Sequence, residues 1–390
     1  MIYAGQSQLE LTISGTTFPL LSLPGMQCHI STNVRQALPT LRICLGDPVS
    51  AISSTLPIVD GTQLGVILND TSTANPTPTK FRALGTPKRM HMPGSPDVTA
   101  YVVNGLLDSI PLVRSNPNTV LTGTSNSVLQ NIATANGLSF KTNVAGNDSM
   151  TWLPGKKTWA AFINHITNHS YIDSNAVMNC GIDETGTLHF YNIVPLLNAA
   201  PKAYIYFGTP SANSSSTSTP SNTFCALQYK AINRSGLMNG MGGYGQRTVQ
   251  PSLDGSVSKY LATNATVTNN SLDIDSDLSS AIQPVSRMSL VAADAGNAHE
   301  NYMQARHQNH RLKCSYSQNI YVLLYQTSGL NIFDTVKFTA TSGSSSPNSL
   351  VDGTYLVTGI ARTLWSNRYY EKIELTTNGP ITSSNAGLLS

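Results

Sequence analysis

Apolar positions alternate with polar ones, or form short continuous runs, at both ends of the chain. "LRICLGD" (41–47) and "TQLGVILND" (62–70) have the length of strands and end in turn-forming residues. Near the other end, Ile373 and Leu375 alternate with polar residues, which is typical of a half-buried antiparallel strand. The pattern predicts a β-rich section over 1–121 and a second one near the C-terminus.

Between these sections the apolar spacing changes to that of helices. "TSNSVLQNIATANGL" (124–138) predicts one helix, with Ser127 and Gln130 as a capping box and Gly137 as its C-terminal stop. "KKTWAAFINHITNHSY" (156–171) predicts a second helix that Thr158 caps. Its apolar stripe consists of Trp159, Phe162, Ile163 and Ile166.

A hairpin follows the two helices. "MNCGIDETGTLHFYN" (178–192) contains two apolar runs that flank a turn at Glu184–Gly186. The helices and the hairpin together predict a small α+β module. After it, "GTPSANSSSTSTPSNT" (208–223) is polar and of low complexity, and apolar periodicity is sparse as far as residue 294, so we expect extended loops there.

A short internal repeat links the two β-rich sections. "YVVNGL" begins at Tyr101 and "YLVTGI" begins at Tyr355, and both follow the pattern Y-x-V-x-G-apolar. On a strand, the Tyr, Val and Gly of such a motif lie on one face, and the glycine permits a close approach of the neighbouring backbone. The repeat predicts two β domains of similar topology on either side of the α+β module.

The composition argues against several functional classes. Charged residues make up only 11% of the 390 residues, the net charge is +3, and Ser, Thr, Asn and Gly take their place. No run of Lys and Arg marks a nucleic-acid or anionic-membrane site, and the densest basic stretch, around Lys88 and Arg89, is interpreted as a solvated loop. Weakly charged surfaces are typical of assembly proteins, because they lose little hydration energy when subunits pack.

The cysteines and the hydropathy pattern predict no special chemistry. No CxxC motif occurs, so the widely spaced cysteines are expected to be free thiols in a reducing compartment rather than a zinc or redox site. They are Cys28, Cys44, Cys180, Cys225 and Cys314. The N-terminus does not resemble a signal peptide, and no membrane-spanning segment is expected.

The histidine-rich stretch "NAHENYMQARHQNH" (297–310) is the strongest candidate for a metal site. It reads as a helix with Asn297 as its cap, so His299 and His310 lie roughly 16 Å apart along the axis. Ligands of one ion must all lie about 2 Å from it. His299 therefore cannot share an ion with His307 and His310.

The remaining histidine pairs leave one alternative open. His307 with His310, or His165 with His169 on the earlier helix, would bind a metal only if a remote third ligand completed the set. We expect these histidines to form polar helix faces. No P-loop, G-x-S-x-G motif or cysteine in a catalytic setting is present. The sequence therefore predicts no catalytic residue, no cofactor and no bound metal, so that the protein is not an enzyme.

Two regions together resemble a known family. The first runs from "GTSNSVLQNIATANGL" to "GIDETGTLHFYN", and the second from "QARHQNHRLKCSYS" to "DGTYLVTGIARTLWSNRYYEKIELTTNG". Their order is similar to that of the baseplate hub proteins of contractile-tailed bacteriophages, whose hub module the spike proteins of type VI secretion share. In that family a G-x-Y-x-V-x-x-I strand belongs to the closing barrel, and "GTYLVTGI" (353–360) matches it.

The resemblance implies a mainly β fold with an α+β insertion and two tube-like antiparallel β-barrel domains. The expected segments are a first barrel over 1–121, an α+β module over 122–200 and a loop-rich linker over 201–296. A helix would then lead into the second barrel over 297–390, with strands from about residue 225.

The resemblance also implies a structural role in the virion. Three chains would form a homotrimeric hub in the tail baseplate, assembled in the host cytoplasm, that joins the six-fold tail tube to the three-fold central spike. Its partners would be the tube or tube-initiator protein and the spike, together with wedge and tape-measure proteins. DNA would pass through its lumen without specific binding, and we expect that lumen to be weakly charged or mildly acidic.

Two other functions remain open from the sequence. A receptor-binding or tail-fibre protein would also be β-rich, polar and trimeric, although the interleaved helices fit a hub better. A phage cell-wall hydrolase is the second alternative, and turnover of peptidoglycan would reveal it.

Overall fold

The computed structural model describes most of the two β-rich sections and the module between them. The described residues are 7–13, 15–19, 27–47, 57–70, 77–85, 87–92, 95–173, 176–208, 222–233, 246–250, 261–265, 288–290, 318–340, 351–365 and 368–377. The predicted helix over 297–310 lies outside these residues.

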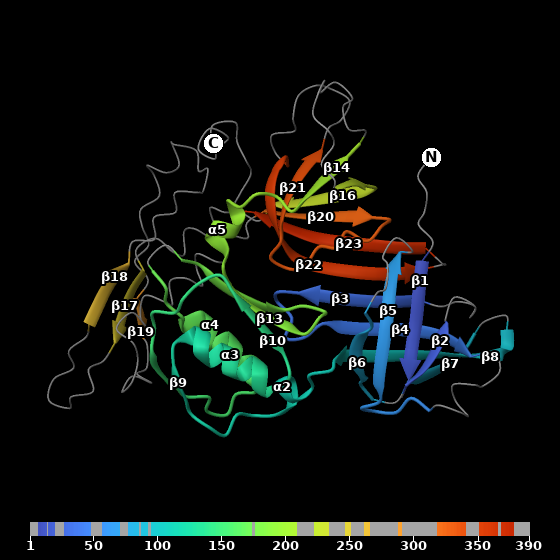
Figure 1. The fold of residues 1–390 in the computed structure, drawn as a ribbon, viewed down its shortest axis with the longest axis horizontal. Helices are drawn as coiled ribbons and strands as arrows, with labels where there is room; N and C mark the ends of the chain where they lie inside the picture. Colours follow the sequence, from blue (N-terminus) through green and yellow to red (C-terminus); the bar gives the residue numbers. More distant parts are fainter. Residues whose placement is uncertain are drawn as a thin grey trace.

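A 15-stranded sheet forms most of the molecule and contains both β-rich sections (Figure 1). The first β section contributes β1 (Ser7–Ile13), β2 (Thr16–Pro19), β3 (Gln27–Asn33), β4 (Thr40–Asp47), β5 (Gln63–Asp70), β6 (Thr79–Ala83), β7 (Lys88–Met92) and β8 (Ser95–Leu107). The second β section contributes β14 (Ala203–Phe207), β15 (Thr223–Ala226), β16 (Gln228–Asn233), β20 (Gln318–Leu324), β21 (Thr335–Ala340), β22 (Gly353–Trp365) and β23 (Arg368–Thr377). The predicted mainly β class is confirmed.

The two sections repeat one strand order. In the first section the strands pair in the order β2-β1-β5-β6-β8-β4-β3, and in the second in the order β15-β14-β21-β22-β23-β20-β16. If the strands of each section are counted along the chain, leaving out β7, both sections have the order second-first-fifth-sixth-seventh-fourth-third. The strand β7 is an addition to the first section. One strand differs in direction, because β14 is parallel to both of its neighbours while β1 is antiparallel to both. The expectation of purely antiparallel sections is therefore wrong at β14.

The second section closes on itself. Residues 223–233 form one strand interrupted at Leu227, whose first half pairs with β14 and whose second half pairs with β20. The amide of Leu227 donates to the carbonyl oxygen of Leu323 at 2.9 Å, which continues the ladder across the interruption. In the first section, by contrast, no ladder among the described residues joins β2 to β3, and β1 and β5 cross over the direction of β3 and β4 (Figure 1).

Each section encloses its own apolar core. In the first, Leu11, Val66 and Phe81 pack against Ile30 and Ile43. In the second, Ile205, Phe338, Val322, Ile360 and Leu375 are all fully buried or nearly so. Every second residue of these strands is apolar and points into the core, and burial of these side chains stabilises each section. The alternation of apolar and polar residues in the sequence predicted this.

The α+β module packs beside the joint of the two sections. It consists of α2 (Pro111–Arg114), β9 (Leu121–Gly123), α3 (Ser125–Ala135), β10 (Ser139–Thr142), β11 (Met150–Trp152), α4 (Trp159–His169), β12 (Met178–Ile182), β13 (Thr187–Asn192) and α5 (Ile193–Leu197). A separate small sheet pairs β17 (Gln246–Gln250) with β18 (Leu261–Ala265) and β19 (Met288–Leu290).

The two helices and the hairpin predicted for the α+β module are confirmed, with one correction at a helix start. Thr158 caps α4, as expected, and Gly137 ends α3 with a φ of 71° that favours glycine. The cap of α3 is Thr124 and not Ser127, because the helix begins at Ser125 and the Thr124 side chain accepts from the amide of Ser127. Thr and Ser are both favoured at this position, so residue type alone did not distinguish two candidates three residues apart.

The range 201–296 contributes more regular structure than a linker. Ala203–Phe207, Thr223–Ala226 and Gln228–Asn233 all belong to the second β section. The strand at 203–207 pairs in parallel with β21, more than a hundred residues away, so no local pattern revealed it.

The sequence repeat that suggested the duplication does not mark equivalent strands. Tyr101–Leu106 lies on β8 and Tyr355–Ile360 on β22. The common strand order instead matches β8 with β23 and β6 with β22. Both repeat glycines do sit at close approaches, since a Cβ on Gly105 would lie 3.1 Å from the Arg82 carbonyl oxygen, and one on Gly359 would lie 2.5 Å from the Asn33 side-chain nitrogen.

Candidate functional site: the joint between the two β sections

The two sections join edge to edge through β22 and β3. These strands pair antiparallel from Gly359 opposite Asn33 to Trp365 opposite Gln27. A side-chain hydrogen bond of 2.8 Å between His29 Nδ1 and Thr363 Oγ1 adds to the backbone ladder. The result is one antiparallel sheet in the order β16-β20-β23-β22-β3-β4-β8-β7, four strands from each section.

This eight-stranded sheet has two unlike faces. Alternate residues point into the two apolar cores and define the covered face. Ile30, Ile43, Ile360 and Ile373 are examples. The residues between them define the uncovered face. The covered face is apolar apart from a buried ion cluster, whereas the uncovered face is mostly polar.

On the covered face, a buried ion cluster fills the gap between the two cores. Arg362 of β22 lies 2.7 Å from Glu184, which is in the β12–β13 turn of the module, and 3.6 Å from Glu371 of β23. Thr32 of β3 donates to Glu184 at 3.2 Å, and Tyr369 donates to Glu371 at 2.8 Å. The cluster thereby ties the hairpin of the module to both sections at once.

Burial and charge oppose each other in this cluster. Burial raises the pKa of Glu184, and the nearby Arg362 only partly offsets this. Burial lowers the pKa of Arg362, but Glu184, Tyr369 and Glu371 together raise it above its ordinary value. Arg362 therefore stays charged and compensates the two carboxylates.

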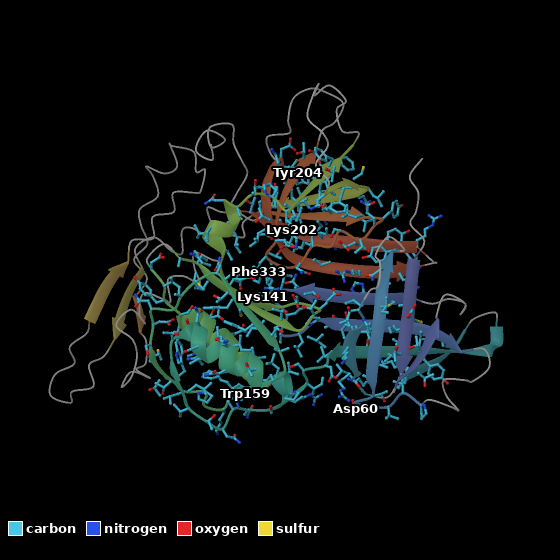
Figure 2. The ribbon with its side chains drawn as sticks, in the orientation of Figure 1. Asp60, Lys141, Trp159, Lys202, Tyr204 and Phe333 are labelled. Carbon is cyan, nitrogen blue, oxygen red and sulfur yellow. The ribbon has the colours of Figure 1, made fainter. Side chains whose placement is uncertain are left out.

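An apolar contact supports the ion cluster from the side of the module. Phe333, labelled in Figure 2, and Ile332 pack against Val177, Ile193 and partly buried neighbours on the hairpin. Phe333 has a φ of 70°, a conformation that costs energy for a bulky residue and is held here by surrounding contacts. A Cβ on Gly181 would lie 2.8 Å from Ile332 Cδ1, so a larger residue at 181 would force the Ile332 side chain to shift.

The hairpin is itself ordered by a buried carboxylate. Asp183 Oδ1 accepts from the amides of Thr185 and Thr187, both at 2.9 Å, and Oδ2 lies 2.8 Å from His189 Nε2. Burial raises the pKa of Asp183, but hydrogen bonds from His189, Thr185 and Thr187 outweigh it and lower the pKa overall. Asp183 thus fixes the turn that presents Glu184 to Arg362.

The uncovered face can be followed across the sheet by its paired positions, since directly opposite residues share a face. One row runs Gln228-Leu323-Lys372-Ala361-Ser31-Thr40-Leu106, and the next runs Tyr370-Thr363-His29-Arg42-Asn104. Two flanking rows run Lys230-Tyr321-Glu374-Gly359-Asn33 and Arg368-Trp365-Gln27-Cys44-Val102-Lys88. Polar residues and single charges prevail on this face.

The charges of the uncovered face are mostly basic. Its exposed cations are Lys88, Arg42, Lys230, Arg368 and Lys372. Among the described positions of these rows the acidic residue is Glu374, which is 8% exposed and lies 3.3 Å from Arg35. Burial, then Arg42 and Lys372, lower the pKa of His29, which places both cations near the centre of the face.

This basic face was not predictable from the linear sequence. Its five cations come from four strands of both β sections, and the linear pattern contains no run of Lys and Arg. Only the pairing of distant strands brings them to one surface.

The sequence-predicted metal candidates do not assemble in the described part of the chain. His299, His307 and His310 lie outside it. His165 and His169 on α4 have ring centroids 4.4 Å apart, and no group of three His, Cys, Asp or Glu residues suited to a metal occurs among the described residues. Burial raises the pKa of the Cys180 thiol to about 11, so this cysteine is a poor nucleophile.

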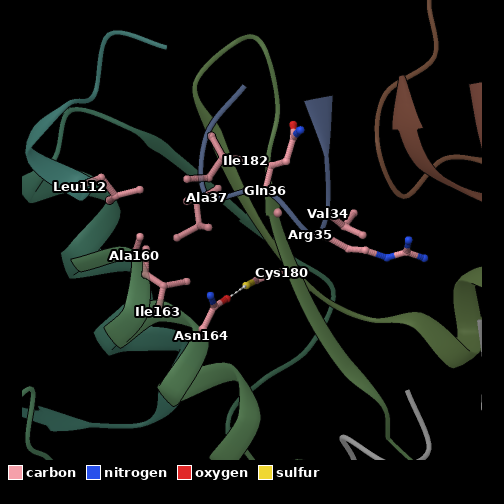
Figure 3. A pocket seen from close by; sticks show the side chains of 12 residues that line it. Val34, Arg35, Gln36, Ala37, Leu112, Ala160, Ile163, Asn164, Cys180 and Ile182 are labelled. Carbon is pink, nitrogen blue, oxygen red and sulfur yellow. Dashed lines mark hydrogen bonds between the residues drawn. The ribbon is translucent and has the colours of Figure 1, made fainter. Parts of the chain in front are cut away.

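The space above Cys180 is too small for a substrate. Figure 3 shows it between the loop that follows β3, the helix α4 and the strand β12, with Asn164 hydrogen-bonded to Cys180. Its volume of about 30 Å³ is room for about one water molecule. None of the helices in the described segments is long and apolar enough to cross a membrane.

The fold has counterparts among solved structures. A 43 kDa tail protein of prophage MuSo2 from Shewanella oneidensis matches with a TM-score of 0.63 and 10% identity, over 95% of this chain and 98% of that one. A tail protein from Neisseria meningitidis MC58 matches with a TM-score of 0.59 and 11% identity, over 96% and 98%.

The chain has the fold of a phage tail protein.

A third solved structure shows the same likeness. The prophage tail protein gp18 of Listeria monocytogenes EGD-e matches with a TM-score of 0.51 and 10% identity, over 98% of this chain and 97% of that one. No protein-family model matches the sequence, and no curated protein matches it. The likeness is therefore one of fold over nearly the full length, at a low level of sequence identity.

Proposed function

We propose that this chain is a structural, non-enzymatic tail protein that forms a trimeric baseplate hub between the tail tube and the central spike. The proposal covers the location in the virion baseplate, the partners at both ends and the two tube-like domains. It treats the first β section, the α+β module and the second β section as the units of one subunit.

The observation that supports it is the repeated four-strand unit of the joint. Two groups of four strands occupy matching positions in the common strand order, namely β16-β20-β23-β22 and β3-β4-β8-β7. In the second group β7 takes the place of β6, because both pair with β8 at successive positions along it. Within the chain, the free edge of β22 meets the free edge of β3. A unit that can join its copy in this way inside one subunit can join it again between subunits.

Two strand edges remain for such a contact. Among the described residues, β7 pairs only with β8 and β16 pairs only with β20. They lie at opposite ends of the eight-stranded sheet. In the proposed trimer, β7 of each subunit pairs antiparallel with β16 of the next and reproduces the contact of β22 with β3.

Such pairing closes a ring of six similar units. Three copies of the eight-stranded sheet give twenty-four strands. Barrels of 16–18 strands already leave an aqueous channel, so this ring is wide enough to be a conduit. The cores and the module lie on the covered face, and the uncovered face then lines the channel. This arrangement has three-fold symmetry toward the spike and approximate six-fold symmetry toward the tube.

Cysteine pairs across the proposed contact test the trimer. In a Cys225→Ser background, which removes an exposed thiol, Lys88→Cys is combined with Lys230→Cys, since both positions belong to the uncovered face. Gln228→Cys replaces Lys230→Cys in a second pair and allows for a different register. Mild oxidation of the purified protein should give covalent dimers and trimers, and light scattering should give three times the chain mass of 41.7 kDa.

The matched control moves one thiol to another element. Lys88→Cys with Lys141→Cys places the second thiol on β10 of the module, and no cross-linked ladder is expected. A monomeric mass, or equal cross-linking in the control, contradicts the proposed contact.

A further inference from the structure

We infer that the uncovered face of the eight-stranded sheet binds the phosphate backbone of duplex DNA, without sequence preference, through Arg42, Lys230 and Lys372. The inference goes beyond the proposed conduit, in which DNA only passes. It also replaces the sequence-based expectation of a weakly charged or mildly acidic lumen.

The charge balance of the face favours an anionic partner. Five exposed cations stand on the four rows described above, and Glu374, the acidic residue on them, is nearly buried and paired with Arg35. Over the whole chain the net charge is only +3. The five cations and one carboxylate of this face therefore give it a larger excess of positive charge than the whole chain has.

The spread of the cations favours a long polyanion over a small one. Arg42 on β4 and Lys372 on β23 are separated by three strand spacings, about 14 Å, and Lys88 and Arg368 by five, about 24 Å. A single phosphate or carboxylate could contact only one of these groups. A duplex carries one negative charge per 1.7 Å of its axis and can contact them all.

Neutral donors between the cations suit the same partner. Thr363, Ser31 and Thr40 stand on the same two central rows as Arg42 and Lys372. Hydroxyl groups and long basic side chains make most contacts to phosphate oxygens in protein–DNA complexes. Beside them, a hollow of about 540 Å³ is lined by Lys230, Tyr321 and Lys372, with Lys372 Nζ 4.7 Å from the centre of the Tyr321 ring.

The face offers little to read a base sequence. It is a strand surface whose five Lys and Arg residues are spread over four strands, and no helix projects from it among the described residues. Binding should therefore depend on phosphate contacts and fall steeply with salt. An acidic protein segment is a different partner, and the experiment separates it from DNA.

The experiment measures binding of a fluorescent 30-base-pair duplex by anisotropy between about 50 and 300 mM salt. Wild-type protein is compared with the triple variant Arg42→Gln, Lys230→Gln, Lys372→Gln. The variant should bind at least about tenfold more weakly at 100 mM salt, and its slope of log K against log salt should be shallower by about 2.7, close to 0.9 for each lost contact.

The matched control removes the same charge elsewhere. Arg114→Gln, Lys141→Gln, Lys156→Gln changes exposed cations of the α+β module and should leave affinity and slope unchanged. An equal loss in both triple variants shows an effect of net charge alone and overturns the inference. So does an absence of duplex binding at 50 mM salt, or binding of polyglutamate but not of duplex.

Failure of the inference and failure of the proposed function are distinguishable. The mass and the cross-links report on the trimer without DNA. A monomer that binds duplex through this face keeps the inference and rejects the hub, whereas a cross-linked trimer without affinity for duplex does the reverse.

Discussion

Arg362 and Glu184 are 178 residues apart in the chain and 2.7 Å apart in the structure. Arg362 belongs to the strand that joins the two β sections, and Glu184 to the turn that the α+β module inserts between their cores. The contact fixes the position of the module relative to the joint. A rigid joint is what a subunit needs if it is to present two strand units at a constant angle in a ring.

Breaking this pair from one side should destabilise the protein strongly. Arg362→Met leaves the buried carboxylates of Glu184 and Glu371 without their cation, and loss of one partner of a buried pair costs about 3–5 kcal/mol. The double variant Arg362→Met, Glu184→Met should lose less than Arg362→Met alone. Urea unfolding followed by fluorescence measures both, and a double variant less stable than the single one would contradict this interpretation.

Acid should weaken the hairpin through Asp183. Its pKa in the fold is lowered, so it stabilises the protein above its unfolded value of about 3.9, and this contribution is lost as the pH falls through the folded pKa. Asp183→Asn should therefore lower the melting temperature near neutral pH. The difference from wild type should shrink below about pH 4. Melting curves from pH 2 to 7 measure it, and a difference independent of pH would exclude a titrating role.

A side chain larger than glycine at position 181 of β12 should disturb the packing of the loop before β21. Gly181→Ala places a methyl group 2.8 Å from Ile332 Cδ1, and overpacking of this kind costs about 1–3 kcal/mol. Ile332→Val removes that Cδ1 atom. The double variant should recover part of the stability lost in Gly181→Ala, as measured by thermal unfolding. If Ile332→Val gives no recovery in the double variant, the close approach is not the cause of the loss.

Local structure was predictable from the sequence where it depends only on residues close together in the chain. The apolar stripe of Phe162, Ile163 and Ile166 gave α4, and the turn at Glu184–Gly186 gave the hairpin, because both depend on neighbours in the chain. The direction of β14 was not predictable, since it depends on β21, more than a hundred residues away. The same holds for the ion cluster of Arg362, whose members come from β22, β23 and the module.

The resemblance to hub proteins predicted the fold correctly, but one argument for the duplication was wrong. The repeat at Tyr101 and Tyr355 lies on strands that are not equivalent, while the duplication itself appears in the strand order. Short motifs of Tyr, Val and Gly arise readily in β-rich sequence, whereas a common order of seven strands requires long-range pairing. The basic face was missed for the same reason, because its cations are scattered along the chain.

A three-dimensional map of the assembled tail particle tests the central claim most directly. The account predicts three copies of this chain in a ring at the junction of tube and spike, with β7 of each subunit against β16 of the next and the face that carries Arg42 and Lys372 toward the axis. A map that places the chain in peripheral fibres, or that shows a ring closed by other edges with this face outward, would contradict it.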